Sequence, residues 1–329
     1  LIKLFLLFIL FLNILKMELM EMEMETKSKT IKLITHNGSF HADDIFAAAT
    51  LSLMLEKRGE SFKIIRTRNH EIINKGDYVF DVGGIYDEKT DRFDHHQLDF
   101  KEKRENNILY SSFGLVWKKY GKELCGSEKV KEIIDNKLVI SIDANDNGVD
   151  LCKNNFENIL PYTVIDVFSV FSPTALENME KDTQFLKVFA WAKEILKREV
   201  KKANDQIEIK KIIQNFYQSS YDKRLIVIDT LKVSRYEIWD ALQEFSEPLF
   251  IVYSTADDWR IVAMRSNNNS FKNRKDFPKT WASLRDEEFQ KISKVSDAIF
   301  CHRGLFLAGV KSKEGAITLA QKALLEPSN

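Results

Sequence analysis

One carboxylate and two imidazoles are adjacent in this sequence, in the Asp-His-His triplet of residues 94–96. Carboxylates and further imidazoles also occur at residues 36–44, at Asp81 and at residues 143–148. Four of the six histidines fall in the two richest of these clusters. Such a mixture of oxygen and nitrogen donors binds divalent metal ions when a fold brings it together. The sequence therefore predicts a metal centre.

Hydrolysis of a phosphate ester is the reaction that this donor set suits best. It needs a nucleophile that is strong at neutral pH and positive charge near the phosphoryl oxygens, and two divalent ions about 3.5 to 4 Å apart supply both. Imidazoles among carboxylates favour Mn²⁺, Co²⁺ or Fe²⁺ over Mg²⁺, which prefers oxygen ligands. The donors available for such a pair are His36, His41, Asp43, Asp81, His95 and Asp143.

Each cluster also has a plainer interpretation. Asp43 and Asp44 would serve equally well as caps of a helix that follows them. Residues 143–148 resemble part of a calcium-binding loop, but they lack the spacing and the closing Glu of an EF-hand. Asp81 follows the apolar run Tyr-Val-Phe, where a buried carboxylate is costly without a cation. Taken together, the clusters favour the metal site.

Alternating strands and helices are expected to position these clusters. Apolar and β-branched runs predict strands at residues 31–35, 62–67, 78–82 and 92–94, and a buried helix over residues 45–55. The polar clusters follow several of these strands, and open α/β sheets bind ligands outside the carboxyl ends of their strands. We expect an α/β fold with a mainly parallel sheet flanked by helices.

Helices are also predicted from Ser111 and Ser112 through Tyr120, over residues 130–142, and over most of residues 174–219. The end of the second of these, residues 138–142, would also suit a strand. A second, smaller α/β unit follows. Its predicted elements are a strand at 225–229, a helix near 238–245, a hairpin of 249–253 and 259–263, apolar runs at 298–302 and 306–309, and a helix over 312–325.

The chain is expected to divide into a leader (residues 1–29), a catalytic domain (30–173), a helical linker (174–221) and a C-terminal substrate-binding domain (222–329). The apolar run of residues 1–15 is shorter than the roughly 20 residues that a membrane span needs, and no small-residue cleavage site follows it. Because the chain begins with Leu, we interpret the leader as an upstream extension of a reading frame that starts at Met17 or a later Met.

Composition restricts the partners and the compartment. Lys plus Arg and Asp plus Glu number 49 each, so the chain has no overall positive field with which to attract polyanions. Three widely spaced cysteines indicate a reducing compartment. We expect an intracellular protein of the cytoplasm, nucleus or mitochondrion, neither secreted nor bound to a membrane.

The Asp94-His95-His96 triplet, the His/Asp cluster after the first strand and the later aspartates resemble the DHH phosphoesterase superfamily. Within it the chain resembles the melanocyte proliferating gene one (MYG1) family, a group of mitochondrial and nuclear 3′ to 5′ RNA exonucleases. The resemblance covers residues 32–324. Its motifs are residues 36–44, 81–84, 92–97, 112–117, 143–148, 271–286 and 302–316. It implies a DHH-type domain joined by a helical linker to a smaller domain of the DHHA1 type.

The resemblance also implies a role for each site residue. It makes His36, His41, Asp43, Asp81, His95 and Asp143 the ligands of two Mn²⁺ ions, or of Mg²⁺ or Co²⁺, with Asp81 as the bridge. His96 would contact the scissile phosphate, and Asp94 would orient the histidines. The substrate-binding residues would be His302, Arg274, Arg285, Gly309 and Lys311.

Two departures from the family pattern affect the substrate side. The family carries an Arg shortly before an Asn-Pro pair, whereas this chain has Val167 and Phe168 before residues 171–173 (Phe-Ser-Pro). Leu305 and Ala308 stand where the family commonly has Gly, and these bulkier residues are expected to narrow the cleft.

Three functions fit the sequence. The first is a metal-dependent 3′ to 5′ exonuclease that hydrolyses the terminal phosphodiester of single-stranded RNA. The second is a hydrolase of small phosphorylated compounds such as short oligonucleotides or nucleotides, which suits the zero net charge. The third is a non-catalytic RNA-binding or scaffold protein that keeps a metal for stability. The full set of donors favours either enzyme, and the sequence leaves the oligomeric state open.

Overall fold

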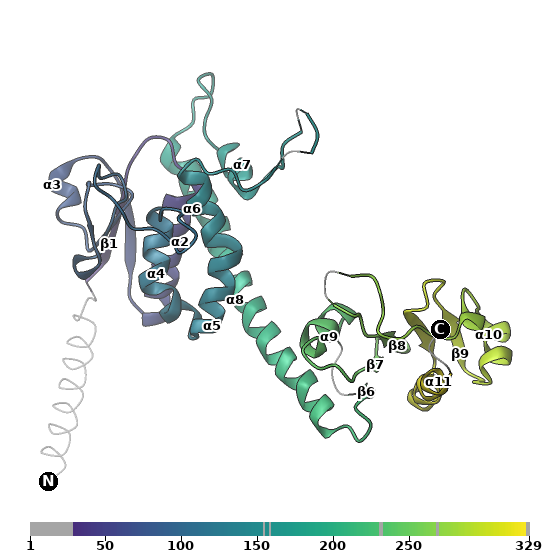
Figure 1. Cartoon of the computed structure of the whole chain (residues 1–329). Coiled ribbons are helices and arrows are strands. Elements are labelled where there is room, and N and C mark those ends of the chain that lie inside the picture. Colours follow the sequence, from purple (N-terminus) through teal and green to yellow (C-terminus); the bar gives the residue numbers. More distant parts are fainter. Residues whose placement is uncertain (1–28, 154, 158, 230–232, 268–269, 327–329) are drawn as a thin grey trace, which may run out of the picture. The chain divides into compact units, whose positions relative to one another are not determined.

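A computed structural model describes residues 29–153, 155–157, 159–229, 233–267 and 270–326 (Figure 1). The chain forms two compact units, Leu1–Ala203 and Asn204–Asn329, which we call the N-terminal and C-terminal units. The division falls within the long helix α8 (Lys181–Ser219), which occupies most of the predicted linker. The predicted leader, apart from Lys29, lies outside the described residues. No helix among the described residues is long and apolar enough to cross a membrane.

The sheet of the N-terminal unit has the strand order β2-β1-β3-β5-β4. Strand β1 pairs in parallel with β2 and β3, and β3 pairs in parallel with β5, whereas β4 is an antiparallel edge strand. The mainly parallel sheet of the sequence prediction is therefore confirmed. The strands are β1 (Ile31–Thr35), β2 (Phe62–Arg66), β3 (Tyr78–Phe80), β4 (Tyr86–Asp87) and β5 (Arg92–Phe93).

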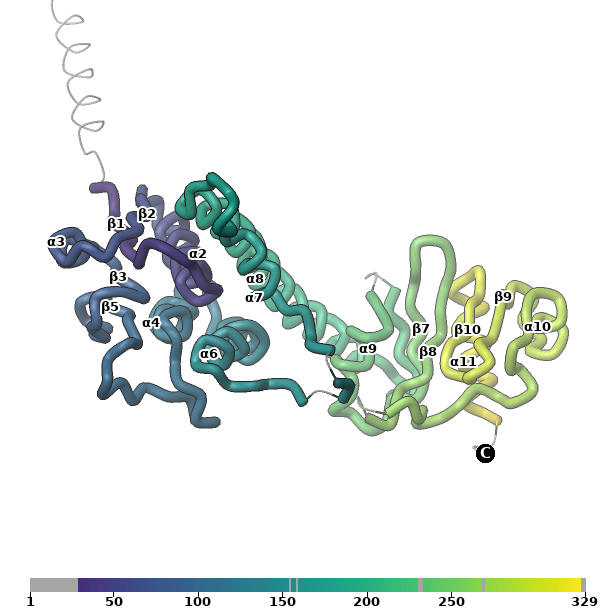
Figure 2. Tube along the Cα trace, turned by 90° about the horizontal axis from the view of Figure 1, so that it is seen from above, coloured from purple at the N-terminus to yellow at the C-terminus, as the bar shows by residue number. Residues whose placement is uncertain are grey.

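Three helices lie together on one face of this sheet, and the short helix α3 (His70–Ile73) lies on the other (Figure 2). The three are α2 (Ala42–Arg58), α4 (Ser112–Cys125) and α6 (Ile140–Asp146). Helix α2 is buried from Ala42 to Leu55, as expected for a helix that is apolar on all sides. Phe46 of α2 stacks on Phe113 of α4 at 5.3 Å and on Phe168 of α7 (Val164–Ser169) at 5.4 Å. A short 3₁₀ helix, Glu88–Thr90, lies between β4 and β5.

The predicted helix over residues 130–142 is confirmed, and the strand alternative for its last five residues is wrong. The chain runs from α5 (Glu128–Ile134) through a π-helical turn (Asp135–Val139) directly into α6. Ser111 caps α4 by accepting a hydrogen bond from the amide of Gly114, as the sequence predicts.

A buried ion pair joins α6 to the segment before α4. The Arg104 Nε donates to Asp143 Oδ2 at 2.7 Å, and the Ser111 amide and hydroxyl donate to Asp143 Oδ1 at 3.1 and 2.6 Å. Arg104 also pairs with Asp135 at 2.6 Å, in the π-helical turn. The Asp143 carboxylate lies against Gly114, where a Cβ atom would come within 2.3 Å of Asp143 Oδ2.

This close approach predicts that Gly114→Ala destabilises the protein. An exposed Gly to Ala change inside a helix usually stabilises by about 1 kcal/mol. Here we expect the free energy of unfolding to fall by about 2 kcal/mol or more, because the methyl group displaces a buried, paired carboxylate. Urea unfolding compared with Lys122→Ala, whose side chain is 68% exposed on the same helix, measures the difference. An unchanged or more stable Gly114→Ala variant would contradict this packing.

The C-terminal unit contains a five-stranded sheet in the order β6-β7-β8-β10-β9. Strands β6 and β7 are parallel, and the other pairs are antiparallel, including the predicted β7–β8 hairpin. The strands are β6 (Leu225–Ile228), β7 (Phe250–Ser254), β8 (Trp259–Ala263), β9 (Ala298–Cys301) and β10 (Leu307–Val310).

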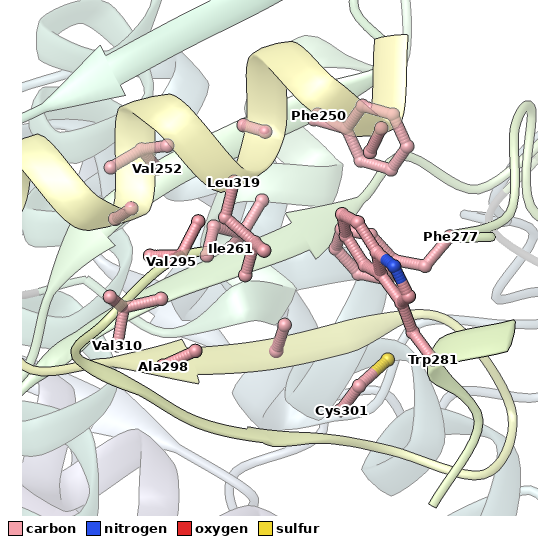
Figure 3. Packing of buried hydrophobic residues seen from close by; sticks show 14 of the residues in the cluster. Phe250, Val252, Ile261, Phe277, Trp281, Val295, Ala298, Cys301, Val310 and Leu319 are labelled. Atoms are coloured by element: carbon pink, nitrogen blue, oxygen red, sulfur yellow. The ribbon is translucent and has the colours of Figure 1, made fainter. Parts of the chain in front are cut away.

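Both faces of this second sheet are covered by helices. Alternate residues of each strand point to opposite faces and pack against the helices there. Ile251 and Tyr253 pack toward α9 (Arg235–Leu242), which begins three residues before its prediction. Phe250 and Val252 pack into the core on the other face, which includes residues of α10 (Asp286–Ser293) and α11 (Lys313–Leu325). Figure 3 shows Phe277 beside Trp281, at the end of the short 3₁₀ helix Lys279–Trp281, in this core.

The turn between β9 and β10 explains one departure from the family pattern. Leu305 has φ +54°, in the left-handed region that glycine adopts most readily. The Gly expected here from the family resemblance would suit this backbone conformation, whereas Leu305 is strained in it. Ala308, the other departure, is fully buried in the core.

Candidate metal centre

The loops at the carboxyl ends of three parallel strands carry the donor side chains. His36 follows β1, Asp81 follows β3 and Asp94 follows β5. Asp81 has φ +53°, a left-handed conformation that costs a non-glycine residue about 1–3 kcal/mol. Its backbone turns sharply at the end of the strand, which is why the predicted strand over 78–82 ends at Phe80.

The Asp81 carboxylate lies between three imidazoles. Its Oδ2 is 3.0 Å from His36 Nε2, and its Oδ1 is 3.4 Å from His95 Nε2 and 3.5 Å from His96 Nδ1. Asp81 and His36 are buried. The two oxygens of one carboxylate thus face different imidazoles, which is the arrangement that a bridging ligand between two cations requires.

A second set of donors lies on the far side of His95. The His95 Nε2 is 3.3 Å from Asp146 Oδ2 and 3.9 Å from Asp43 Oδ2. Among the described residues, three groups of potential ligands have donor atoms within 4.8 Å of one another: His36, His41 and Asp81; Asp81, His95 and His96; Asp43, His95 and Asp146. Asp81 and His95 each belong to two groups, so the groups adjoin.

Unpaired buried acceptors show that a cation fits this cluster. Both carboxylate oxygens of Asp43 and one of Asp44 are buried without a hydrogen-bond partner in the described part of the chain, as is His95 Nε2. Buried acceptors of this kind are costly unless a proton or a cation satisfies them. Neutral imidazole and carboxylate are also the donor types that a transition-metal dication accepts.

Electrostatics separates the carboxylates into two kinds. Burial and the charges of Asp81, Asp146 and Asp44 raise the pKa of Asp43 well above its ordinary value. Burial likewise raises the pKa of Asp44 to about 7, with a further contribution from Asp81. Burial also acts on Asp81, but the neighbouring imidazoles of His36 and His95, 3.0 and 3.4 Å away, outweigh it and lower its pKa. Asp81 is therefore the carboxylate that stays charged.

His96 is held differently from His95. Its Nδ1 is 2.7 Å from Asp94 Oδ1, and the amide of Gly84 donates to Asp94 Oδ2 at 2.6 Å. The hydrogen bond to Asp94 outweighs desolvation and raises the pKa of His96. His96 is 62% exposed, and it lines a polar cavity of about 340 Å³ with His36, Asp81, Gly84 and Arg68.

The structure brings together five of the six predicted ligands and does not bring in Asp143. Both Asp143 oxygens are engaged by Arg104 and Ser111, as described above. Its place among the donors is taken by Asp146, one turn later in α6. The expectation for Asp143 is corrected because its carboxylate is held by Arg104 and Ser111 and belongs to none of the three ligand groups.

The helix-cap alternative for Asp43 and Asp44 also needs correction. The residue that caps α2 is His41, and Asp44 at the third helical position accepts a hydrogen bond from the His41 amide at 2.9 Å. Asp44 thus completes a capping box through one oxygen, while its other oxygen is 3.5 Å from His36 Nε2. Asp43 accepts no such hydrogen bond.

The predicted substrate residues of the C-terminal unit have different surroundings. The predicted substrate-binding role of Arg274 is corrected. Its guanidinium stabilises the surrounding loops by donating to the backbone carbonyls of Gln243, Phe245, Pro248 and Arg265. Gly309 is buried in β10, where a Cβ would meet the Phe300 ring at 2.6 Å. His302, Arg285 and Lys311 have no carboxylate partner among the described residues, and their roles stay predictions.

Sequence reasoning missed three residues of the site: Asp146, Asp44 and Arg68. Asp146 lies in the same motif as Asp143, and because residues three apart are neighbours on a helix surface, the sequence does not separate the two. Asp44 is predicted only as a cap. Arg68 follows β2, and nothing in its local sequence separates it from an ordinary exposed arginine.

The fold and the donor cluster define an α/β protein with a candidate metal centre at the carboxyl end of a parallel sheet. The chain belongs to the MYG1 exonuclease family, described as an uncharacterised protein family (UPF0160), whose sequence model matches residues 32–324.

Curated relatives match nearly the whole chain. It is 27% identical to a MYG1 protein of Schizosaccharomyces pombe over 325 residues, covering 91% of this chain and 99% of the relative. It is also 27% identical to the MYG1 exonuclease of Homo sapiens over 337 residues, covering 89% and 86%. Among solved structures, the chain is similar to RecJ of Thermus thermophilus in complex with Mn²⁺. The match covers 92% of this chain and 53% of the RecJ chain, with 10% identity and a TM-score of 0.27. That likeness is too distant to bear on the site.

We expect different effects when each of these two aspartates of α6 is changed to Asn. We expect Asp146→Asn to weaken Mn²⁺ binding at least tenfold, because it removes a charged donor beside His95 and Asp43. Asp143→Asn should lower the free energy of unfolding by about 2 kcal/mol, because the buried Arg104 then keeps only Asp135 as a charge partner. Isothermal titration with Mn²⁺ and urea unfolding separate the two. Equal losses of Mn²⁺ affinity in both variants would return Asp143 to the ligand set.

The metal-free protein is expected to lose stability as pH rises from about 4 to 7. The pKa of Asp44 is raised from 3.8 to about 7, so within this window the folded protein retains a proton that the unfolded chain has released. Hydrogen bonding to Asp81 raises the pKa of His36 despite its burial. The stabilising effect of protonated His36 is fully present below pH 6.5 and is lost as the pH rises through the pKa of His36 in the folded protein. Asp81, whose pKa is lowered, contributes stability already present above 3.8.

Urea unfolding in EDTA across this window measures the decline. Asp44→Asn keeps an acceptor for the His41 amide but cannot ionise, so its stability should depend less steeply on pH than that of the wild type. Mn²⁺ should reverse the decline, because it binds the deprotonated carboxylates. A slope that is the same in both proteins would show that Asp44 titrates normally.

Proposed function

We propose that this protein is a metal-dependent phosphodiesterase, and specifically a 3′ to 5′ exonuclease that hydrolyses the terminal phosphodiester of single-stranded RNA. The observation that carries the proposal is the donor cluster in which Asp81 and His95 are each shared between two adjoining ligand groups. The exonuclease names of the relatives point to the same reaction.

In this proposal two divalent ions, Mn²⁺ in preference to Mg²⁺ or Co²⁺, are held by a set that contains Asp146 in place of Asp143. When bound, the ions supply the Lewis acidity that phosphodiester hydrolysis needs. The ligands are His36, His41, Asp43, Asp81, His95 and Asp146. Asp81 would be the ligand shared by both ions, and the imidazoles beside it, which lower its pKa, favour that role.

His96 contacts the scissile phosphate in this proposal. Its Nδ1 is fixed by Asp94, so a protonated ring has its Nε2–H available to donate to a phosphoryl oxygen. Asp94 is a positioning residue, since it holds both the His96 ring and the Gly84 amide. Arg68, in the same cavity, adds a positive charge for the phosphate.

Single-stranded nucleic acid is the substrate class that the C-terminal unit favours. The Arg265 guanidinium lies 3.9 Å from the centre of the Trp239 ring and 5.1 Å from that of Phe271, which is 91% exposed. Exposed aromatic rings beside arginines bind bases by stacking and the backbone by charge. His302, 4.5 Å from the Phe306 ring, Arg285 and Lys311 are further candidates.

A second candidate function is hydrolysis of short oligonucleotides or small phosphoesters. The balanced charge of the chain favours it, because long polyanions gain little from a protein without net positive charge. Three free cysteines, two of them buried, suit an intracellular location for either enzyme.

The test is Mn²⁺-dependent cleavage of single-stranded RNA of graded length, labelled at the 3′ end in one set and at the 5′ end in another. We expect the wild type to release the 3′ label as mononucleotides. Asp81→Asn and His95→Ala should each lose at least about a hundredfold in rate, equivalent to about 2.7 kcal/mol of transition-state stabilisation.

His70→Ala is the matched control, because His70 is exposed in α3 and belongs to no ligand group. Its rate should equal that of the wild type. Activity confined to the shortest RNAs would support the second candidate. Inactivity on RNA of every length and on small phosphodiesters, with Mn²⁺, Mg²⁺ or Co²⁺, would overturn both functions.

A further inference from the structure

A second cavity, of about 270 Å³, borders carboxylates of the donor cluster and has a lining that does not include Asp94 or His96. Asp43 and Asp146 form one part of its wall, and His41 lines both this cavity and the polar one. All the residues that line it belong to the N-terminal unit. A substrate with its phosphate at the donor cluster therefore has two neighbouring spaces into which its substituents can extend.

The two cavities differ in chemistry. The polar cavity is lined by Arg68 and by the glycines before Asp94, whereas among the residues that the structure describes no Lys or Arg lines the second. Apart from Asp43 and Asp146, the second is walled largely by apolar side chains, among them Phe40, Ile165 and Phe168. Beyond the two proposed metal ligands, the side chains of this wall offer no positive charge to pair with a phosphate. The second cavity thus suits an uncharged, flat and largely apolar group.

The apolar wall is rigid. Phe168 is 2% exposed and stacks on Phe46 of α2 at 5.4 Å. Phe40 is 4% exposed and meets the Phe185 ring edge-on at 6.0 Å. Side chains that are already packed lose little conformational freedom when a ligand is bound, which favours binding of a group of matching shape.

One side chain of the wall has hydrogen-bonding groups to spare. Asn145 of α6 is exposed, and no hydrogen bond to its carboxamide is found among the described residues. A carboxamide offers a donor and an acceptor together, which complements the edge of a nucleobase. Asn145 lies one residue before Asp146, so this carboxamide and the proposed metal ligand belong to one helical turn.

We propose that this cavity binds the nucleobase next to the scissile phosphate, with Ile165 and Phe168 against the base and Asn145 hydrogen-bonded to its edge. The placement of the phosphate rests on the proposed function. The consequence is that the enzyme distinguishes nucleotides from other phosphoesters within the N-terminal unit, through contacts to the base.

The first experiment measures binding without turnover. Isothermal titration with AMP and with ribose 5-phosphate, in the presence of Mn²⁺, compares two ligands that share the sugar phosphate and differ in the base. We expect AMP to bind the wild type at least tenfold more tightly. Ile165→Trp fills the cavity and should reduce this ratio to less than about threefold. Val167→Trp, a partly buried position of the same helix that lines neither cavity, should preserve it.

A second variant keeps the test decisive if Ile165→Trp disturbs the fold. Asn145→Ala removes only an exposed carboxamide. We expect it to lower the affinity for AMP at least threefold and to leave the affinity for ribose 5-phosphate unchanged. Equal affinities of the wild type for the two ligands would overturn the base site, as would an AMP preference that survives both Ile165→Trp and Asn145→Ala.

The result is separable from the proposed function. If RNA is cleaved but AMP and ribose 5-phosphate bind equally, the base site fails and the phosphodiesterase stands. If no phosphodiester is cleaved but the AMP preference is present and is lost in Ile165→Trp, the cavity is a nucleotide site and the proposed reaction is wrong.

Discussion

Mutual repulsion among buried carboxylates is the constraint on which the N-terminal unit depends. Asp43, Asp44 and Asp81 are buried almost completely, and Asp146 lies beside them. Without cations, such a group can persist only by taking up protons or by accepting hydrogen bonds from imidazoles. The raised pKa values of Asp43 and Asp44 and the lowered pKa of Asp81 are two outcomes of this single problem. The rest of the unit supplies the stability that keeps the group together.

Several elements contribute to that stability. The first turn of α2 places Asp43 and Asp44 at the positive end of a helix dipole, which lowers the cost of their charge. The helix itself is buried along most of its length, so its apolar contacts with α4 and α6 offset the unfavourable terms at its start. Parallel strands then bring the ends of β1 and β3 together, and the strained backbone of Asp81 aims its carboxylate at both His36 and His95.

Much of this arrangement can be predicted from sequence, because residues that follow neighbouring parallel strands meet at one edge of a sheet. That rule is enough to bring His36, Asp81 and His95 together. It cannot separate Asp143 from Asp146, since which face of a helix points inward depends on the winding of the preceding turns. It also cannot show that Arg274 is used up by backbone carbonyls, because those partners lie on segments about 10 to 30 residues away in the chain. The glycine expected at Leu305 becomes intelligible only with its φ angle.

The π-helical turn at Asp135–Val139 sets the rotation of α6. A turn of this kind contains one residue more than an ordinary helical turn, and successive residues of a helix are about 100° apart around its axis. The extra residue therefore fixes the rotation of α6 about its axis. With this rotation, Asp143 faces Arg104 and Asp146 faces His95. Removing one residue from this turn would rotate the whole of α6 by about a quarter of a revolution without changing its composition. Asp143 would then be turned away from Arg104, and Asp146 from His95.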